Sequence, residues 1–209
     1  MNEVNYLCDT NILINLYHAD SSSTALCEGY FDCFNRVGFA EPVHHELLRT
    51  PELKNESRKE TFVELYNRLD SKYYVFFIDD LDDLTKQAFI DEMLLQGYSD
   101  YKGINGPQDN VGEIATLILA HLIDIPLIHT NDQPFMDFVE ENRDIYSDVV
   151  IVTLREVLDQ LISDDKQRIR LTATIEGNSR IFKERIKNQK SEEEMNLKLE
   201  QLRNKFSKR

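Results

Sequence analysis

Short apolar runs alternate with longer amphipathic segments along most of the chain. Four of the runs are rich in β-prone or aliphatic residues and predict buried strands, at residues 4–8, 73–78, 125–130 and 149–152. Apolar positions spaced three or four residues apart predict helices at residues 11–18, 22–36, 42–50, 57–69, 79–97, 111–124, 133–142 and 153–162. Strands that alternate with helices in this way are typical of a parallel α/β sheet covered by helices on both faces.

The pattern changes beyond about residue 163, where no further strand is predicted. Apolar residues at helical spacing near the end of the chain (Met195, Leu199, Leu202 and Phe206) indicate a terminal helix that packs on the domain or on a partner. We therefore expect a compact unit over residues 1–163 and a mostly helical extension over residues 164–209.

Charge divides the chain at the same place. The net charge is −14, yet residues 164–209 contain 13 Lys and Arg against 8 Asp and Glu, which leaves −19 on residues 1–163. Such asymmetry indicates an acidic unit with a basic extension that could bind nucleic acid. A solvated helix of mixed charge explains the extension equally well.

Membrane and disulfide-stabilised classes are disfavoured by composition. The N-terminus has no basic and apolar signal-peptide pattern, and no apolar stretch approaches the length of a membrane span. Cys8, Cys27 and Cys33 fit neither a disulfide framework nor a zinc-ligand pair and are interpreted as reduced thiols. We expect a soluble, cytoplasmic protein without membrane contact.

Several acidic residues are expected at one edge of the sheet. Asp9 directly follows one predicted strand and Asp132 follows another after a single residue, and ligand sites in parallel sheets lie outside the carboxyl ends of the strands. A helix beginning near Glu113 rises ~15 Å, and the strand that leads back to Asp132 covers a similar distance. Glu113 is therefore expected beside Asp132, and Glu46 lies in the first turn of another helix.

Each acid also has a structural explanation. Asp9 and Asp132 could be helix N-caps. Asn110 and Glu113 fit a capping box, and Glu46 could pair with Arg49. Converging carboxylates, however, would repel one another unless a cation neutralised them, and acidic oxygen ligands suit Mg²⁺ or Mn²⁺.

The order of these motifs resembles that of PIN domains over roughly residues 3–163. The segment "YLCDTNILINLY" is similar to the opening motif of that family, an apolar strand ending in Asp, then Thr or Ser, then Asn or a small residue. An "EL" pair (Glu46, Leu47), "GEIATLILAH" with Glu113, and "LIHTND" with its Thr-x-Asp ending follow in the family's order. The closing "VVIVTLREVLDQL" also resembles the last strand and helix of the family.

The resemblance implies a metal-dependent ribonuclease with a three-layer α/β/α fold. Asp9, Glu46, Glu113 and Asp132 would hold one or two Mg²⁺ or Mn²⁺ ions, which activate a water for attack on the RNA phosphate. Thr10, Asn11 and Thr130 would orient that water or a phosphate oxygen. Because many bacterial members are toxins, an antitoxin or another protein partner and a homodimer are left open. The chain is longer than a minimal toxin-type domain.

A basic cluster in the extension is expected to bind RNA, through Arg180, Lys183, Arg185, Lys187 and Lys190.

Asp80 and Asp82 resemble the strand-then-D-x-D start of haloacid-dehalogenase-type phosphatases, but acids in the first turn of a helix explain them better. A catalytically silent PIN-like module that binds RNA or protein is the alternative to the ribonuclease.

Overall fold

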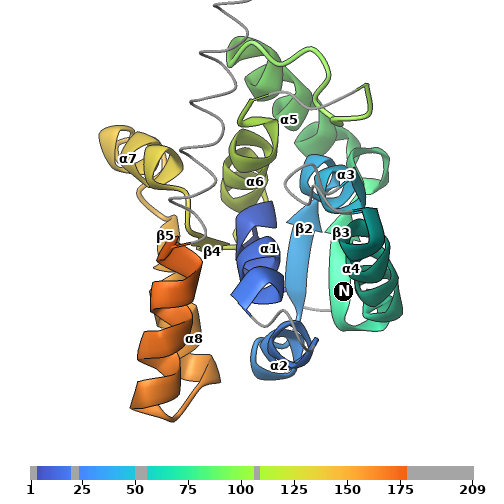
Figure 1. The fold of residues 1–209 in the computed structure, drawn as a ribbon. Coiled ribbons are helices and arrows are strands. Elements are labelled where there is room, and N and C mark those ends of the chain that lie inside the picture. The colour runs from blue at the N-terminus through green and yellow to red at the C-terminus, as the bar shows by residue number, and fades with distance from the viewer. Residues whose placement is uncertain (1–3, 20–23, 50–55, 106–108, 178–209) are drawn as a thin grey trace, which may run out of the picture.

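Five parallel strands form the sheet, in the order β3-β2-β1-β4-β5 (Figure 1). The computed structural model describes residues 4–19, 24–49, 56–105 and 109–177. The strands are β1 (Tyr6–Cys8), β2 (Val37–Ala40), β3 (Tyr73–Phe76), β4 (Leu127–Thr130) and β5 (Val150–Thr153). The predicted fold class, a three-layer α/β/α arrangement, is confirmed.

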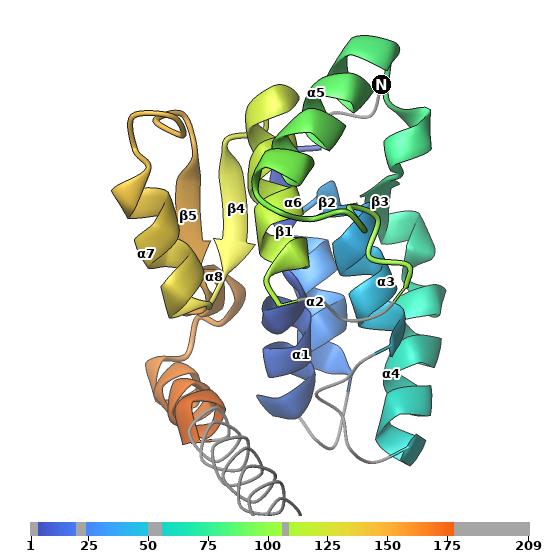
Figure 2. The same cartoon turned by 90° about the horizontal axis from the view of Figure 1, so that it is seen from above.

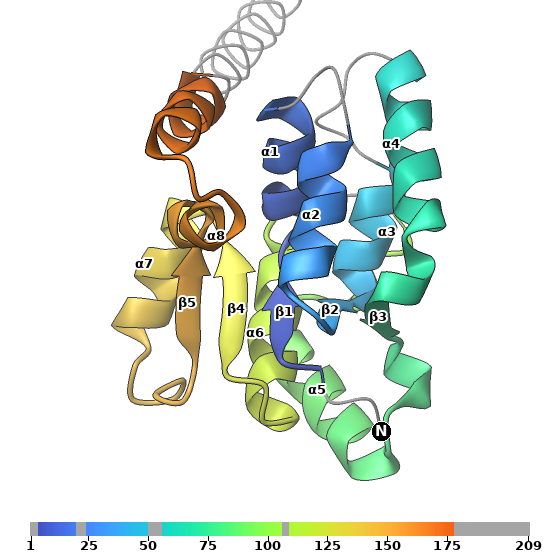
Figure 3. The same ribbon diagram turned by 90° about the horizontal axis from the view of Figure 1, so that it is seen from below.

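Helices cover both faces of this sheet. The helices are α1 (Thr10–Ala19), α2 (Ala25–Cys33), α3 (Glu41–Arg49), α4 (Glu56–Arg68), α5 (Asp83–Leu95), α6 (Val111–Leu122), α7 (Gln133–Glu141) and α8 (Leu154–Leu161). Helices α5, α6 and α7 lie on one face (Figure 2), and α2 and α8 lie together on the other (Figure 3). Short 3₁₀ helices at Asp70–Lys72 and Ile78–Asp80 flank β3.

Local sequence signals explain where several of these helices begin and end. Thr153 and Glu156 form a reciprocal capping box at the start of α8. Asp82 caps α5 by accepting hydrogen bonds from the Leu84 and Thr85 backbone N–H groups, both at 3.1 Å. Gly97 adopts a φ of 91° just after α5, a conformation that ends helices and favours glycine. These signals fix the helix boundaries around the sheet.

Strand β2 was missed by the sequence prediction. The helix predicted over residues 22–36 extended too far, because α2 ends at Cys33 and the chain then enters a fully buried strand. A Cβ on Gly38 would lie 2.7 Å from Phe76 Cε2 and 2.8 Å from Val4 Cγ1. The glycine therefore allows close packing beside β2, but it also removes the β-branched pattern that predicts a strand.

The central strand is β1, and the strand order reverses between β1 and β4. This central strand has β2 on one side and β4 on the other, and Cys8 pairs with His129 in the parallel register between β1 and β4. Such a reversal is the point at which open α/β sheets form a crevice outside the carboxyl ends of their strands. Asp9 and Asp132 follow the two strands that flank this point.

Part of the predicted extension is visible in the structure. Residues 165–177 are helical, in line with the expected helical extension, and the rest of it lies outside the described residues. Within the described residues, no helix combines the length and the apolar character that crossing a membrane requires.

Candidate functional site

Asp9 is the buried centre of the candidate site. It lies directly after β1 and is 1 % exposed. Its Oδ2 accepts hydrogen bonds from Asn11 Nδ2 and, at 3.0 Å, from Thr130 Oγ1. Both donors are side chains, so the Asp9 carboxylate does not cap α1 through these contacts. The N-cap explanation of Asp9 is therefore not supported.

Asn11 and Thr130 connect the ends of β1 and β4. Asn11 Oδ1 accepts a hydrogen bond from the Asn131 backbone N–H at 2.9 Å, and Thr130 Oγ1 accepts one from the Asp132 N–H at 3.1 Å. The sequence predicted that these side chains orient water or phosphate. In the structure they hold the Asp9 carboxylate and the loop that carries Asp132, and their role toward water or phosphate stays a prediction.

Glu46 reaches the same edge from α3. Thr10 Oγ1 donates a hydrogen bond to Glu46 Oε2 at 2.7 Å. Burial raises the pKa of Glu46, and the Thr10 hydrogen bond and the charge on Arg49 offset part of that rise. The Arg49 guanidinium donates to the Ile104 carbonyl at 2.6 Å. Thr10, rather than the expected partner Arg49, is thus the hydrogen-bond partner of Glu46.

The two remaining acids lie at helix starts. Asp132 caps α7, because its Oδ1 accepts a hydrogen bond from the Phe135 N–H at 2.8 Å. This confirms the structural explanation for Asp132. Glu113 lies in the first turn of α6, but the predicted capping box is wrong: Asn110 has a φ of 62° and its side chain makes no capping hydrogen bond.

Three other carboxyl groups are close enough to Asp9 to affect its pKa. Burial is the largest cause of an Asp9 pKa well above its usual value. The charges on Glu113 and then Glu46 raise this pKa further, and Asp132 raises it more weakly. The hydrogen bond from Thr130 acts in the opposite direction. The structure therefore brings all four predicted acids to the edge where the strand order reverses.

The four carboxylates have the chemistry that a hard divalent cation prefers, but the structure does not arrange them as a ligand group. Four carboxylates supply the oxygen ligands that Mg²⁺ and Mn²⁺ prefer. Among the described residues, however, no three His, Cys, Asp or Glu side chains form a group arranged to hold a metal ion. Glu113, Glu46 and Asp132 therefore act electrostatically on Asp9 without forming a ready ligand shell.

Gly112 and Tyr98 border the site and were not predicted. A Cβ on Gly112 would lie 3.2 Å from both Glu46 Oε2 and Val43 Cγ2, so the glycine leaves room for the Glu46 carboxylate. The Tyr98 hydroxyl donates to the Asp109 carbonyl at 3.0 Å. Burial and then the charge on Glu113 raise the Tyr98 pKa, which places this ring beside α6. The sequence signal that could have pointed to Gly112 is its position directly before Glu113.

Replacing Gly112 with Ala is expected to displace Glu46 and lower any activity of the site. The new methyl group would crowd the Glu46 carboxylate, and either that side chain or α6 must shift by a few tenths of an ångström. A crystal structure of the variant would show the displacement. Gly29→Ala in α2 is the matched control, because its Cβ meets Leu161 Cδ1 at an ordinary 3.5 Å. An unmoved Glu46 would contradict the prediction.

The other predicted residues are not among the groups that shift the Asp9 pKa, or they lie outside the described residues. Asp80 and Asp82 are exposed beside the edge strand β3, and Asp82 caps α5, so their helix-start explanation is supported. The five basic residues of the predicted RNA-binding cluster, Arg180, Lys183, Arg185, Lys187 and Lys190, all lie outside the described residues.

No model of a known protein family matches the chain, and no curated protein matches it. Function is therefore inferred from sequence motifs and from the arrangement of side chains at the reversal of the strand order.

Proposed function

We propose that this protein is a PIN-type, metal-dependent ribonuclease whose site is the acid cluster at the carboxyl ends of β1 and β4. The observation that carries the proposal is the buried Asp9 carboxylate, whose pKa is raised by burial and by three further acids. Burying a charge beside like charges destabilises a fold unless a cation compensates it. Such an arrangement is typical of functional sites.

Asp9, Glu46, Glu113 and Asp132 would hold Mg²⁺ or Mn²⁺. When bound, such an ion supplies an acidified water and positive charge for phosphodiester hydrolysis. Asn11 and Thr130 hold the Asp9 carboxylate in place, and Thr10 holds Glu46. These hydrogen bonds restrict the rotamers of two ligands before any ion or substrate arrives, which lowers the cost of organising the site.

The purified chain should cleave RNA with Mn²⁺ or Mg²⁺ and should be inactive in EDTA. The measurement is electrophoresis of an end-labelled, single-stranded RNA, with DNA of the same sequence as the comparison. Gly29→Ala should cleave as the natural protein does. Cleavage that persists in EDTA, or cleavage unaffected by substitution of the four acids, would contradict the proposed mechanism.

The basic cluster of the extension is expected to supply much of the RNA affinity. The remainder of the chain carries strong negative charge, so phosphates need the cations of residues 164–209. Replacing Arg180, Lys183, Arg185, Lys187 and Lys190 with Gln should flatten the dependence of the dissociation constant on salt, measured by fluorescence anisotropy with labelled RNA. An unchanged slope would assign the cluster to structure or to a protein partner.

A catalytically silent RNA- or protein-binding module is the second candidate. The observation in its favour is that the acids of the described residues are not arranged as a metal-ligand group. This candidate predicts RNA binding without cleavage in any divalent cation, and no stabilisation by Mn²⁺. The cleavage assay and thermal melts with Mn²⁺ therefore separate the two functions.

A further inference from the structure

An apolar stripe lies on the exposed side of α5. Leu84 and Leu95 are 84 % and 80 % exposed, and the exposed Ala88 lies between them on the same side of the helix. The opposite side of α5 buries Phe89 and Met93, and the helix packs against α6 (Figure 2). Large aliphatic side chains that are aligned on one exposed face indicate an interaction surface.

The chain around this stripe is strongly acidic. Residues 79–95 contain six Asp and Glu against one Lys, and that Lys86 is paired with Asp79 at 2.6 Å. The exposed Asp91 lies within the stripe itself. Like charges disfavour the pairing of α5 with the same helix of a second copy. The surface therefore suits an apolar partner that carries positive charge.

The sequence after residue 194 has the complementary pattern. Its apolar residues recur at the spacing i, i+4, i+7 and i+11, at Met195, Leu199, Leu202 and Phe206. The positions of the stripe on α5 have the same spacing, at Leu84, Ala88, Asp91 and Leu95. Residues 195–209 contain five Lys and Arg against one Glu, and they lie outside the described residues. Amphipathic helices dock on apolar surfaces through anchors spaced in this way.

The connection to this segment is long enough to reach α5 of the same chain. The described residues end at Gly177, and residues 178–194 join it to Met195. When extended, this connection spans roughly 60 Å. A compact domain of this size is roughly 40 Å across. Because such a tether gives an effective concentration in the millimolar range, the stripe of the same chain is favoured over that of a second copy.

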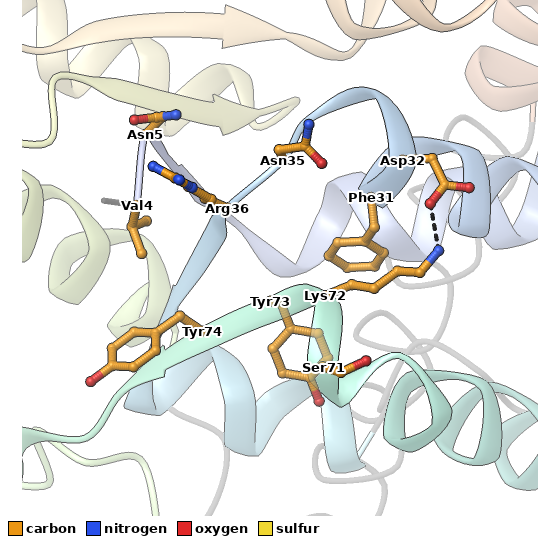
Figure 4. A pocket seen from close by; sticks show the side chains of 10 residues that line it. All are labelled: Val4, Asn5, Phe31, Asp32, Asn35, Arg36, Ser71, Lys72, Tyr73 and Tyr74. Atoms are coloured by element: carbon orange, nitrogen blue, oxygen red, sulfur yellow. Dashed lines mark hydrogen bonds and ion pairs between the residues drawn. The ribbon is translucent and has the colours of Figure 1, made fainter. Parts of the chain in front are cut away.

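Two hollows in the described part of the chain suit this segment less well. A cavity of about 620 Å³ lies at the amino ends of β1 and β3, but its lining is mostly polar and includes the ion pair of Lys72 with Asp32, drawn as a dashed line in Figure 4. A groove of about 420 Å³ between α2 and α8 is more apolar, but Asp164 is the only charged residue in its lining. Of the three surfaces, α5 combines an apolar stripe with concentrated negative charge.

We propose that residues 195–206 pack as an amphipathic helix on the exposed stripe of α5 of the same chain. The four apolar side chains of the segment lie along the stripe, and its cations face the acids around it. Arg203 follows Leu199 by one turn of this helix and suits the Asp91 carboxylate. Both ends of the connection that holds the basic cluster are then attached to the domain. The docking does not depend on the proposed ribonuclease activity.

Hydrogen–deuterium exchange of the full chain, followed by mass spectrometry, tests the proposal. An isolated helix of this length is marginal in water, so undocked amides of residues 195–206 exchange nearly as fast as in an unfolded peptide. We expect exchange slower by at least about tenfold, and we expect this protection to disappear in Leu84→Glu and in Leu95→Glu. Absence of protection in the natural chain, or protection that survives both substitutions, would overturn the proposal.

Charge reversal and a matched control locate the contact. Asp91→Lys should lower the protection severalfold, and the additional change Arg203→Glu should restore it. Ile169→Glu is the control, because it puts the same charge at an aliphatic position of another helix that is 68 % exposed. It should keep full protection. Loss of protection in Ile169→Glu but not in the α5 variants would place the segment on the other helix.

Two further measurements complete the test. Since the substituted positions of α5 are exposed, the variants should melt within a few degrees of the natural chain, which separates lost docking from a lost fold. Light scattering at micromolar concentration should give the mass of a monomer. A dimer mass together with protection that rises with protein concentration would place the segment on a second copy and overturn the proposal.

Discussion

Replacing Asp9 with Asn is expected to lower Mn²⁺-dependent RNA cleavage by at least about a hundredfold. Loss of groups that merely orient metal ligands costs about 10–100-fold in metal affinity or activity, and a ligand at the centre of the cluster should cost no less. The amide oxygen can still accept the Thr130 hydrogen bond, so the junction of β1 and β4 should persist. Cleavage rates of the purified variant at saturating Mn²⁺ provide the measurement.

The same substitution is expected to keep or raise stability without metal. The amide that replaces the Asp9 carboxylate would carry no buried charge, so the repulsion by Glu113 and Glu46 at this position would disappear. Thermal melts in EDTA would show an equal or higher midpoint, which separates lost chemistry from a lost fold. Asp82→Asn is the matched control, since Asn caps helices as well as Asp does. Undiminished cleavage by Asp9→Asn would rule out this site.

Mn²⁺ is expected to raise the free energy of unfolding by roughly 2.7 kcal/mol when its concentration is a hundredfold above its dissociation constant. A cation that binds only the folded state stabilises it by mass action and removes the repulsion among the acids. Amide substitutions should shrink the stabilisation, most for Asp9 and then for Glu113 and Glu46, which act most strongly on the Asp9 pKa. Urea unfolding with and without Mn²⁺ measures the difference.

The pH dependence of the metal-free protein follows from the same pKa shifts. The folded-state pKa values of Asp9 and Glu46 are raised above those of the unfolded chain, so the folded state binds these protons more tightly. The resulting stabilisation is fully present below the unfolded pKa values of about 4 and is lost as the pH rises through the folded values. In EDTA, the stability of the natural protein should therefore fall with rising pH relative to Asp9→Asn.

Asp80→Asn and Asp82→Asn are the controls for the metal effect. Both residues are exposed on the chain between β3 and α5, and neither is among the groups that shift the Asp9 pKa. Their substitution should leave the Mn²⁺ stabilisation intact. If these variants abolished the stabilisation while the four cluster acids did not, the metal would bind beside β3 and the ribonuclease proposal would fail.

Local signals in the sequence were enough to predict most elements of the fold. Short apolar runs correctly predicted β1, β3, β4 and β5, and periodic apolar positions predicted the helices between them. Burial of one or both faces of an element produces a regular pattern of apolar residues in the sequence. The sequence of strand β2 does not show such a pattern. Its Gly38 is explained by close contacts with Phe76 and Val4, which are distant in sequence.

The meeting of Asp9, Asp132 and Glu113 at one edge could be predicted from the sequence, because parallel strands bring their carboxyl ends to one edge and a helix that leads into such a strand begins there. The place of Glu46 at that edge was expected only from the family resemblance. The local hydrogen-bond partners of the four acids could not all be predicted. Asp132 caps a helix as its sequence context indicates, whereas Asn110 does not form the expected box with Glu113. Asn110 adopts a left-handed φ of 62°, which the predicted capping box did not anticipate.

The sequence by itself determined the alternation of strands and helices, the charge asymmetry and the acids that follow the strands, because each is a property of neighbouring residues. Only the tertiary structure decided that Thr10 holds Glu46, that Thr130 holds Asp9, and that Gly112 leaves room for a carboxylate. These contacts join residues separated by 36 to 121 positions, so they exist only after the strand order has formed. The strand order itself arises from the packing of the whole domain, which places β1 between β2 and β4.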